Sequence, residues 1–132
     1  MASSSNVQLT IALQEPDLDD EERQKETETL LKQVRELEEV DNASLVPDPN
    51  QQDGSKDAGG FLIGLLTAEV NAKNIKALFG FLGDRLSGKT IELEVEANGK
   101  KLKVKASSQQ ELSAAIQAAK DFIALEAQLP NG

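Results

Sequence analysis

The segment Gly83–Thr90 reads Gly-Asp-Arg-Leu-Ser-Gly-Lys-Thr and satisfies the phosphate-loop pattern Gly-x-x-x-x-Gly-Lys-Thr. In such loops a strand precedes the glycines and a helix follows, so that backbone N–H groups and the helix N-terminus meet the phosphates. Here the hydrophobic spacing predicts a helix before the segment and a strand after it. We therefore expect Gly88 to end a helix, Lys89 and Thr90 to open a strand, and no nucleotide hydrolysis at this segment.

The other reactive side chains form no recognisable catalytic arrangement. The chain contains no cysteine and no histidine, which excludes thiolate catalysis, cysteine metal sites and the usual general base near neutral pH. A serine and a lysine can combine in hydrolases, but the serines here cluster in predicted loops. Asp48, Asp53 and Asp57 offer oxygen ligands, yet their spacing does not match a calcium loop. We predict no catalytic residue, no metal site and no cofactor, and hence no enzyme.

The charge of the chain also narrows the possible partners. Its 132 residues include 14 basic and 23 acidic side chains, a net charge of -9 that disfavours nucleic acid and anionic membranes. The four phenylalanines are the only aromatic residues, too few for base-stacking platforms. The N-terminus has no secretory pattern, and the longest apolar run, Phe61–Leu66, is far shorter than the roughly 20 residues that span a bilayer. We expect a cytoplasmic protein that binds neither nucleic acid nor membrane.

The strongest structural signal is a β-hairpin at Asn98-Gly99, between two alternating runs that extend from Thr90 to Ala106. A two-residue turn there pairs Ala97 with Lys100. The register that follows puts Glu–Lys pairs on one face and apolar pairs on the other: Glu96–Lys101, Glu94–Lys103, Glu92–Lys105, Val95–Leu102, Leu93–Val104 and Ile91–Ala106. A slip of one residue would expose the apolar face, so the register is strongly specified.

Other elements follow from local patterns. Val7 to Leu13 alternate as a half-buried strand, and Asn42 to Val46 predict a short second strand before a loop over Asp48–Gly60. Between the two strands we expect a helix capped by Asp17 or Asp19, with an apolar stripe of Leu30, Leu31, Val34 and Leu37. Ser108 and Glu111 predict a capping box that opens a last helix, which ends before Pro130.

The segment Gly60–Leu86 predicts a mostly helical stretch with two apolar stripes. One stripe should lie on the sheet, and the other contains Ile63, Leu66, Val70, Ala77 and Phe81. The second stripe either lies under another helix, or the helix breaks near Asn71–Asn74 or at Gly80. Alternatively, it is a surface for a partner or for self-association, centred on Val70, Ala77 and Phe81.

The element order strand, helix, strand, helix, strand, strand, helix predicts an α+β two-layer sandwich. We expect a four-stranded mixed or antiparallel sheet with three helices on one face, and the Glu–Lys ladder of the hairpin on the uncovered face. We predict one domain over residues 6–129, a disordered tail at residues 1–5 and a C-terminal tail at residues 130–132.

Over residues 6 to 125 the layout resembles the effector-associated constant component family of small bacterial proteins and domains. The resemblance lies in five features: an acidic helix ending in Leu-Lys-Gln-Val-Arg-Glu-Leu, the strand Ala-Ser-Leu-Val-Pro, the loop Asp53–Lys56, the hairpin, and Ser-Ser-Gln-Gln-Glu-Leu at the last helix. Members accompany caspase-like or trypsin-like peptidases and other effectors in conflict systems built around nucleotide-dependent switches. The resemblance implies a non-enzymatic adaptor and brings no residue-level site.

We therefore expect an accessory adaptor whose partner is a peptidase-type effector or a nucleotide-dependent switch protein. It would dock through the second apolar stripe or through the loop at residues 48–60. The alternative is a self-associating or small-ligand-binding domain.

Overall fold

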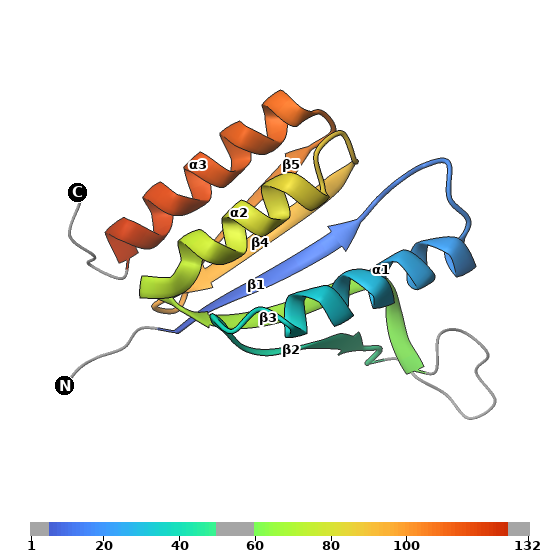
Figure 1. Ribbon diagram of the computed structural model, residues 1–132, viewed down its shortest axis with the longest axis horizontal. Helices are drawn as coiled ribbons and strands as arrows, with labels where there is room; N and C mark the ends of the chain where they lie inside the picture. Colours follow the sequence, from blue (N-terminus) through green and yellow to red (C-terminus); the bar gives the residue numbers. More distant parts are fainter. Residues whose placement is uncertain (1–5, 50–59, 127–132) are drawn as a thin grey trace.

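The computed structural model describes residues 6–49 and 60–126, which form five antiparallel strands under a layer of three helices (Figure 1). The strands are β1 (Asn6–Leu13), β2 (Val40–Pro47), β3 (Phe61–Asn71), β4 (Ile91–Ala97) and β5 (Lys100–Ala106). The helices are α1 (Asp20–Arg35), α2 (Ile75–Arg85) and α3 (Gln109–Glu126), and a short 3₁₀ turn, η2 (Ala72–Asn74), precedes α2. The strand order is β2-β3-β1-β4-β5, so the first strand of the chain lies at the centre. The expected α+β architecture with helices on one face is confirmed.

The main correction concerns residues 61–71, which form β3 and not the first part of a helix. The sheet therefore has five strands instead of the predicted four, and the element order gains a strand. Leu66 and Val70 point into the core while Leu65 and Thr67 lie half-buried on the other face, so apolar residues occur on both faces of β3. This mixture produced the helix-like spacing. Pairing with β1 on one side and β2 on the other then outweighs local preference.

The hairpin is confirmed in every pair that the sequence predicts, from Ala97–Lys100 to Ile91–Ala106. Asn98 has φ 55° and Gly99 has φ 79°, the two positive values that a two-residue turn of this kind requires. The core-facing residues of β4 are buried, whereas Lys101, Lys103 and Lys105 of β5 are exposed. The Glu–Lys ladder therefore lies on the uncovered face of the sheet.

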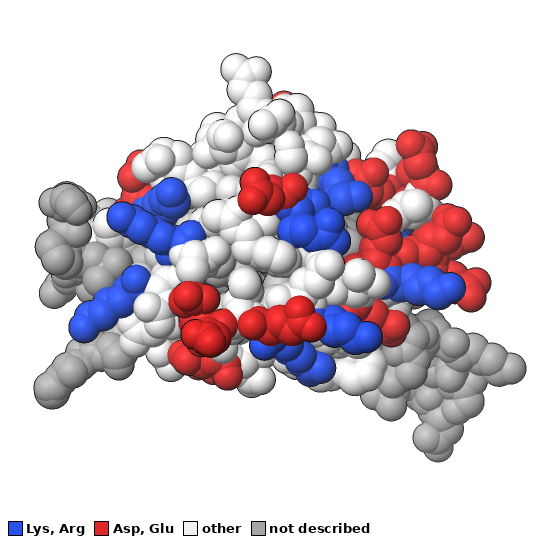
Figure 2. Space-filling view, viewed as in Figure 1, with Lys and Arg blue, Asp and Glu red and all other residues white. Residues whose placement is uncertain are grey.

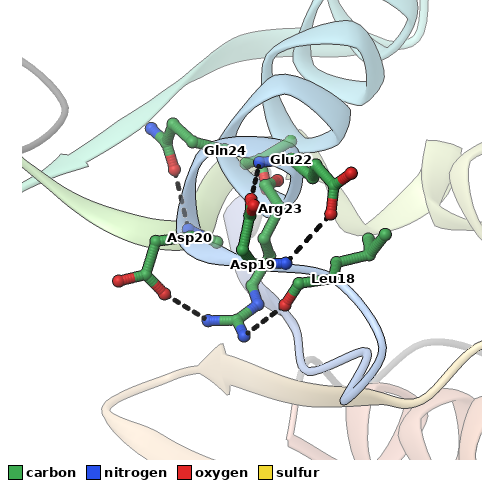
Figure 3. A network of polar contacts seen from close by, with 8 residues as sticks. Leu18, Asp19, Asp20, Glu22, Arg23 and Gln24 are labelled. Atoms are coloured by element: carbon green, nitrogen blue, oxygen red, sulfur yellow. Dashed lines mark hydrogen bonds and ion pairs between the residues drawn. The ribbon is translucent and has the colours of Figure 1, made fainter.

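A reciprocal cap begins α1 at Asp19, which settles the choice between Asp17 and Asp19 (Figure 3). The Glu22 N–H donates to Asp19 Oδ1 at 2.8 Å, and the Asp19 N–H donates to Glu22 Oε1 at 3.1 Å. Asp20, Glu21 and Glu22 fill the first turn, where the helix dipole favours negative charge. Part of the acidic run of this segment therefore has a structural role.

Gln24 fastens α1 to β3 from inside the protein. Its side chain is buried, and its Oε1 accepts a hydrogen bond from the Gly64 N–H at 2.8 Å (Figure 3). Next to it, Arg23 donates to the Leu18 carbonyl oxygen at 3.3 Å and pairs with Asp20 at 3.4 Å. These contacts hold the start of α1 against the end of β3 where the loop from β2 returns.

The cap of α3 differs slightly from the predicted capping box. The Glu111 N–H donates to Ser108 Oγ at 3.1 Å as expected. Glu111 Oε1, however, accepts from the N–H and hydroxyl of Ser107, at 2.8 and 2.9 Å, one residue earlier than the box requires. The predicted tails, the end of the last helix near Pro130, and the loop residues Asp53 and Asp57 lie outside the described residues.

Candidate functional site

The three residues proposed as a partner surface do not share one surface. Val70 lies in β3 opposite Val7 and is 0 % exposed, so it belongs to the core. Ala77 and Phe81 lie on α2, where Ala77 is exposed and Phe81 is half-buried against the core. Only the part of the predicted stripe that lies on α2 remains accessible.

Ala77 and Phe81 face toward α1. They share one side of α2 with Arg85, because residues four apart in a helix lie above one another. The Arg85 Nε–H donates to Gln33 Oε1 of α1 at 2.8 Å, which fixes that side of α2 against α1. The two helices are thus joined across their gap by a polar bridge at this point.

A hollow of about 380 Å³ lies between α1 and the C-terminal end of α2. We call it the α1–α2 groove, and it is lined by Lys25, Glu26, Thr29, Arg85 and Lys89. Lys89 Nζ lies 3.7 Å from Glu26 Oε1, but the two side chains are 35 % and 42 % exposed. Water and salt therefore screen this pair, and it contributes little to stability.

The groove is basic although the chain is acidic. It holds three cations and one carboxylate, against a net charge of -9 for the whole chain. Within residues 6–49 and 60–126, Lys25 makes no side-chain hydrogen bond or ion pair, and the side-chain bond of Arg85 uses Nε alone. Figure 2 shows Lys and Arg side chains over the C-terminal end of α2, beside the acidic side chains that gather over the N-terminal end of α1.

Arg85 and Lys89 come from the phosphate-loop pattern, but the backbone there is used differently. Helix α2 precedes the segment and β4 follows it, which is the predicted reversed order. Gly88 turns the chain with φ 82°, and the Lys89 N–H donates to the Leu86 carbonyl oxygen at 3.0 Å. The Thr90 N–H donates to the Glu15 carboxylate. These two backbone N–H groups therefore bind oxygens of the protein itself.

A second, smaller hollow of about 220 Å³ lies on the uncovered face of the sheet. Its lining combines neutral residues with one carboxylate: Gln8, Asn42, Ala43, Ser44, Thr67, Ala68 and Glu69. Hydroxyl and amide groups dominate it, so it shows none of the charge contrast of the α1–α2 groove.

Two further searches cover the described part of the chain. Among those residues no three carboxylates gather closely enough to hold a metal ion. None of their helices combines the length and the apolar character that crossing a membrane would need. Comparisons of the chain with protein-family models, curated proteins and solved structures found no match.

Sequence reasoning did not identify the groove, because a groove depends on which helices become neighbours. Lys25, Thr29 and Gln33 recur at a spacing of four on α1, a signal for one side of a helix. Nothing in that spacing reveals that α2 lies opposite. The phosphate-loop pattern drew attention to Lys89, but for a chemistry that the reversed element order disfavours.

Proposed function

We propose that this protein is a non-catalytic adaptor that docks a protein partner in the α1–α2 groove. The observation that carries the proposal is the basic lining of this groove beside two accessible apolar residues, Ala77 and Phe81, on the same side of α2. Grooves between helices that combine apolar anchors with charge are a common way to bind an amphipathic segment. The adaptor role agrees with what the resemblance to effector-associated constant components implies.

The charges of the groove indicate the kind of segment that would dock. A partner segment with acidic residues would meet Lys25, Arg85 and Lys89, and its apolar residues would meet Phe81. Complementary charge raises the association rate and the specificity, while the apolar contact at the centre supplies most of the affinity. A peptidase-type effector or a nucleotide-dependent switch protein with such a segment is the expected partner.

An affinity capture from the native host's lysate tests the proposal, followed by binding of the captured protein in purified form. The matched variants are Arg85→Glu, inside the groove, and Lys76→Glu, an exposed position of the same helix on the side away from α1. Both change the charge by the same amount. We expect Lys76→Glu to keep the partner and Arg85→Glu to weaken it at least about tenfold, which corresponds to about 1.4 kcal/mol.

Equal recovery by the two variants would reject the groove as the docking surface. Recovery of the bait alone, with a doubled mass in solution, would favour self-association instead. A third outcome is a rise in melting temperature with inorganic phosphate that Arg85→Glu abolishes. It would favour the small-ligand alternative.

A further inference from the structure

The two edges of the sheet are built differently. The β2 edge is interrupted by two shifts of register, between Val40 and Asn42 and between Leu45 and Pro47, and β2 ends at Pro47. Bulges and proline are features that keep an edge from pairing with another strand. The β5 edge has neither, because its pairing with β4 is continuous over all seven residues. The feature it has instead is a row of lysines.

The outward backbone groups of β5 belong to these lysines. A two-residue turn makes Ala97 and Lys100 a hydrogen-bonded pair, and such pairs then alternate along an antiparallel ladder. The N–H and C=O groups of Leu102 and Val104 therefore point toward β4. Those of Lys101, Lys103 and Lys105 point outward, and in the described part of the chain no strand lies beyond β5.

The lysine side chains of this edge are also largely free. Lys101 Nζ lies 3.8 Å from Glu94 Oε2 while its side chain remains 61 % exposed. Lys103 and Lys105 make no ion pair with any described residue, although they stand opposite Glu94 and Glu92. The edge thus presents unpaired backbone groups and positive charge together.

We propose that the β5 edge binds an extended acidic segment of a protein partner as a sixth strand of the sheet. Alternating Asp or Glu side chains of that segment would lie beside the lysines on the uncovered face, and each cross-strand pair contributes roughly 0.2–1 kcal/mol. Its intervening residues would be apolar, because they face the side on which Leu102 and Val104 lie half-buried. The hairpin already contains this chemistry, since β4 alternates glutamates with apolar residues on the other side of β5.

A second copy of the chain is a poorer occupant of this edge. Two β5 edges side by side would bring lysines against lysines, and like charges across strands are destabilising. The proposed edge also lies in the sheet, away from the α1–α2 groove on the helical layer, as Figure 1 shows. This inference therefore does not rest on the proposed function. Together, the two surfaces would let an adaptor hold two partners.

Fluorescence anisotropy with a labelled peptide, Ser-Val-Glu-Val-Glu-Val-Glu-Ser, tests the proposal. We expect saturable binding that weakens as salt rises, because exposed charges are screened. The double variant Lys103→Gln with Lys105→Gln should bind at least about tenfold more weakly. The matched control, Lys73→Gln with Lys76→Gln, removes two exposed lysines elsewhere and should bind like the wild type.

The peptide backbone supplies the decisive arm of the experiment. N-methylation of alternate residues removes the N–H groups on one edge of the peptide only. Methylation on the edge that pairs with β5 should abolish binding, and methylation on the other edge should leave it unchanged. Equal effects of the two methylated peptides, equal effects of the two double variants, or no saturation up to about 1 mM would each overturn the proposal. A dimer that dissociates in Lys103→Gln with Lys105→Gln would also overturn it, in favour of a second copy.

Discussion

Gly64 shows how a single residue ties two distant segments together. It has φ 81°, a region that side-chain-bearing residues rarely adopt, and its N–H donates to Gln24 forty residues earlier. A Cβ at this position would lie 3.0 Å from the Leu13 carbonyl oxygen and 2.9 Å from Arg23 Cδ. Both the backbone conformation and the close approach therefore require glycine.

We predict that Gly64→Ala lowers the free energy of unfolding by about 1–3 kcal/mol through backbone strain, with a further loss from the contact with Leu13. Gly88→Ala is the matched control, because Gly88 has φ 82° and an added Cβ would meet nothing within 4 Å. Urea unfolding followed by circular dichroism measures both variants. A loss in Gly64→Ala no larger than in Gly88→Ala would show that the close approach is unimportant.

Local signals predicted some residues and missed others for a physical reason. Asn98-Gly99 could be identified from the sequence because a two-residue turn depends on its own φ values and on adjacent strands. Gln24 and Gly64 could not, because their hydrogen bond joins residues whose proximity depends on the packing of α1 against β3. The same holds for the bond from Arg85 to Gln33 that spans the α1–α2 groove.

At the scale of elements, the start of α3 is stabilised by a carboxylate. The N–H of Ser107, and then its hydroxyl, donate to Glu111 and hold the pKa of that carboxyl below its ordinary value of 4.5. Since the charged form is favoured in the folded protein, this contribution is complete above the ordinary pKa. It is lost as the pH falls through the lowered pKa.

We predict that the stability difference between wild type and Glu111→Gln shrinks as the pH falls below about 4.5. Urea unfolding at a series of pH values measures this difference. An NMR titration of the Glu111 side chain provides a direct check, since its midpoint should lie below 4.5. A midpoint at or above that value would contradict the hydrogen bonds described for Ser107.

The elements differed in how far their sequence determined them. The hairpin formed by β4 and β5 was predictable in full register, because alternation and turn signal agree. Strand β3 was not, because Leu65 places an apolar side chain on the uncovered face and Gly64 interrupts the regular backbone. An apolar run of this kind fits a buried strand or a helix, and its pairing with β1 and β2 decides between them.

At the scale of the whole molecule, β1 organises the fold although it comes first in the chain. It pairs with β3 on one side and β4 on the other, so its partners lie more than fifty residues away. Strand order of this kind depends on how the helices cover one face, which local patterns do not encode. The fold class was therefore predictable from the sequence, whereas the strand order and the α1–α2 groove were not.

The last prediction compares Val70 with Phe81, which the sequence had placed on one stripe. Val70→Asp would bury an unpaired carboxylate in the core that all three helices share, at a cost of several kcal/mol. That cost approaches the roughly 5–15 kcal/mol that stabilises a typical domain, so we expect an unfolded chain by circular dichroism. Phe81→Ser changes a half-buried side chain and should remain folded, with a melting temperature that is lower but measurable.

A folded Val70→Asp protein with the melting temperature of the wild type would contradict the position of β3. With the expected result, loss of a partner in Val70→Asp would report unfolding and not a lost contact. Phe81 and Arg85 are then the positions at which binding and folding can be separated, because both lie on the accessible side of α2 that faces α1. Their variants, measured for melting temperature and partner affinity together, show whether this face of the molecule binds a protein.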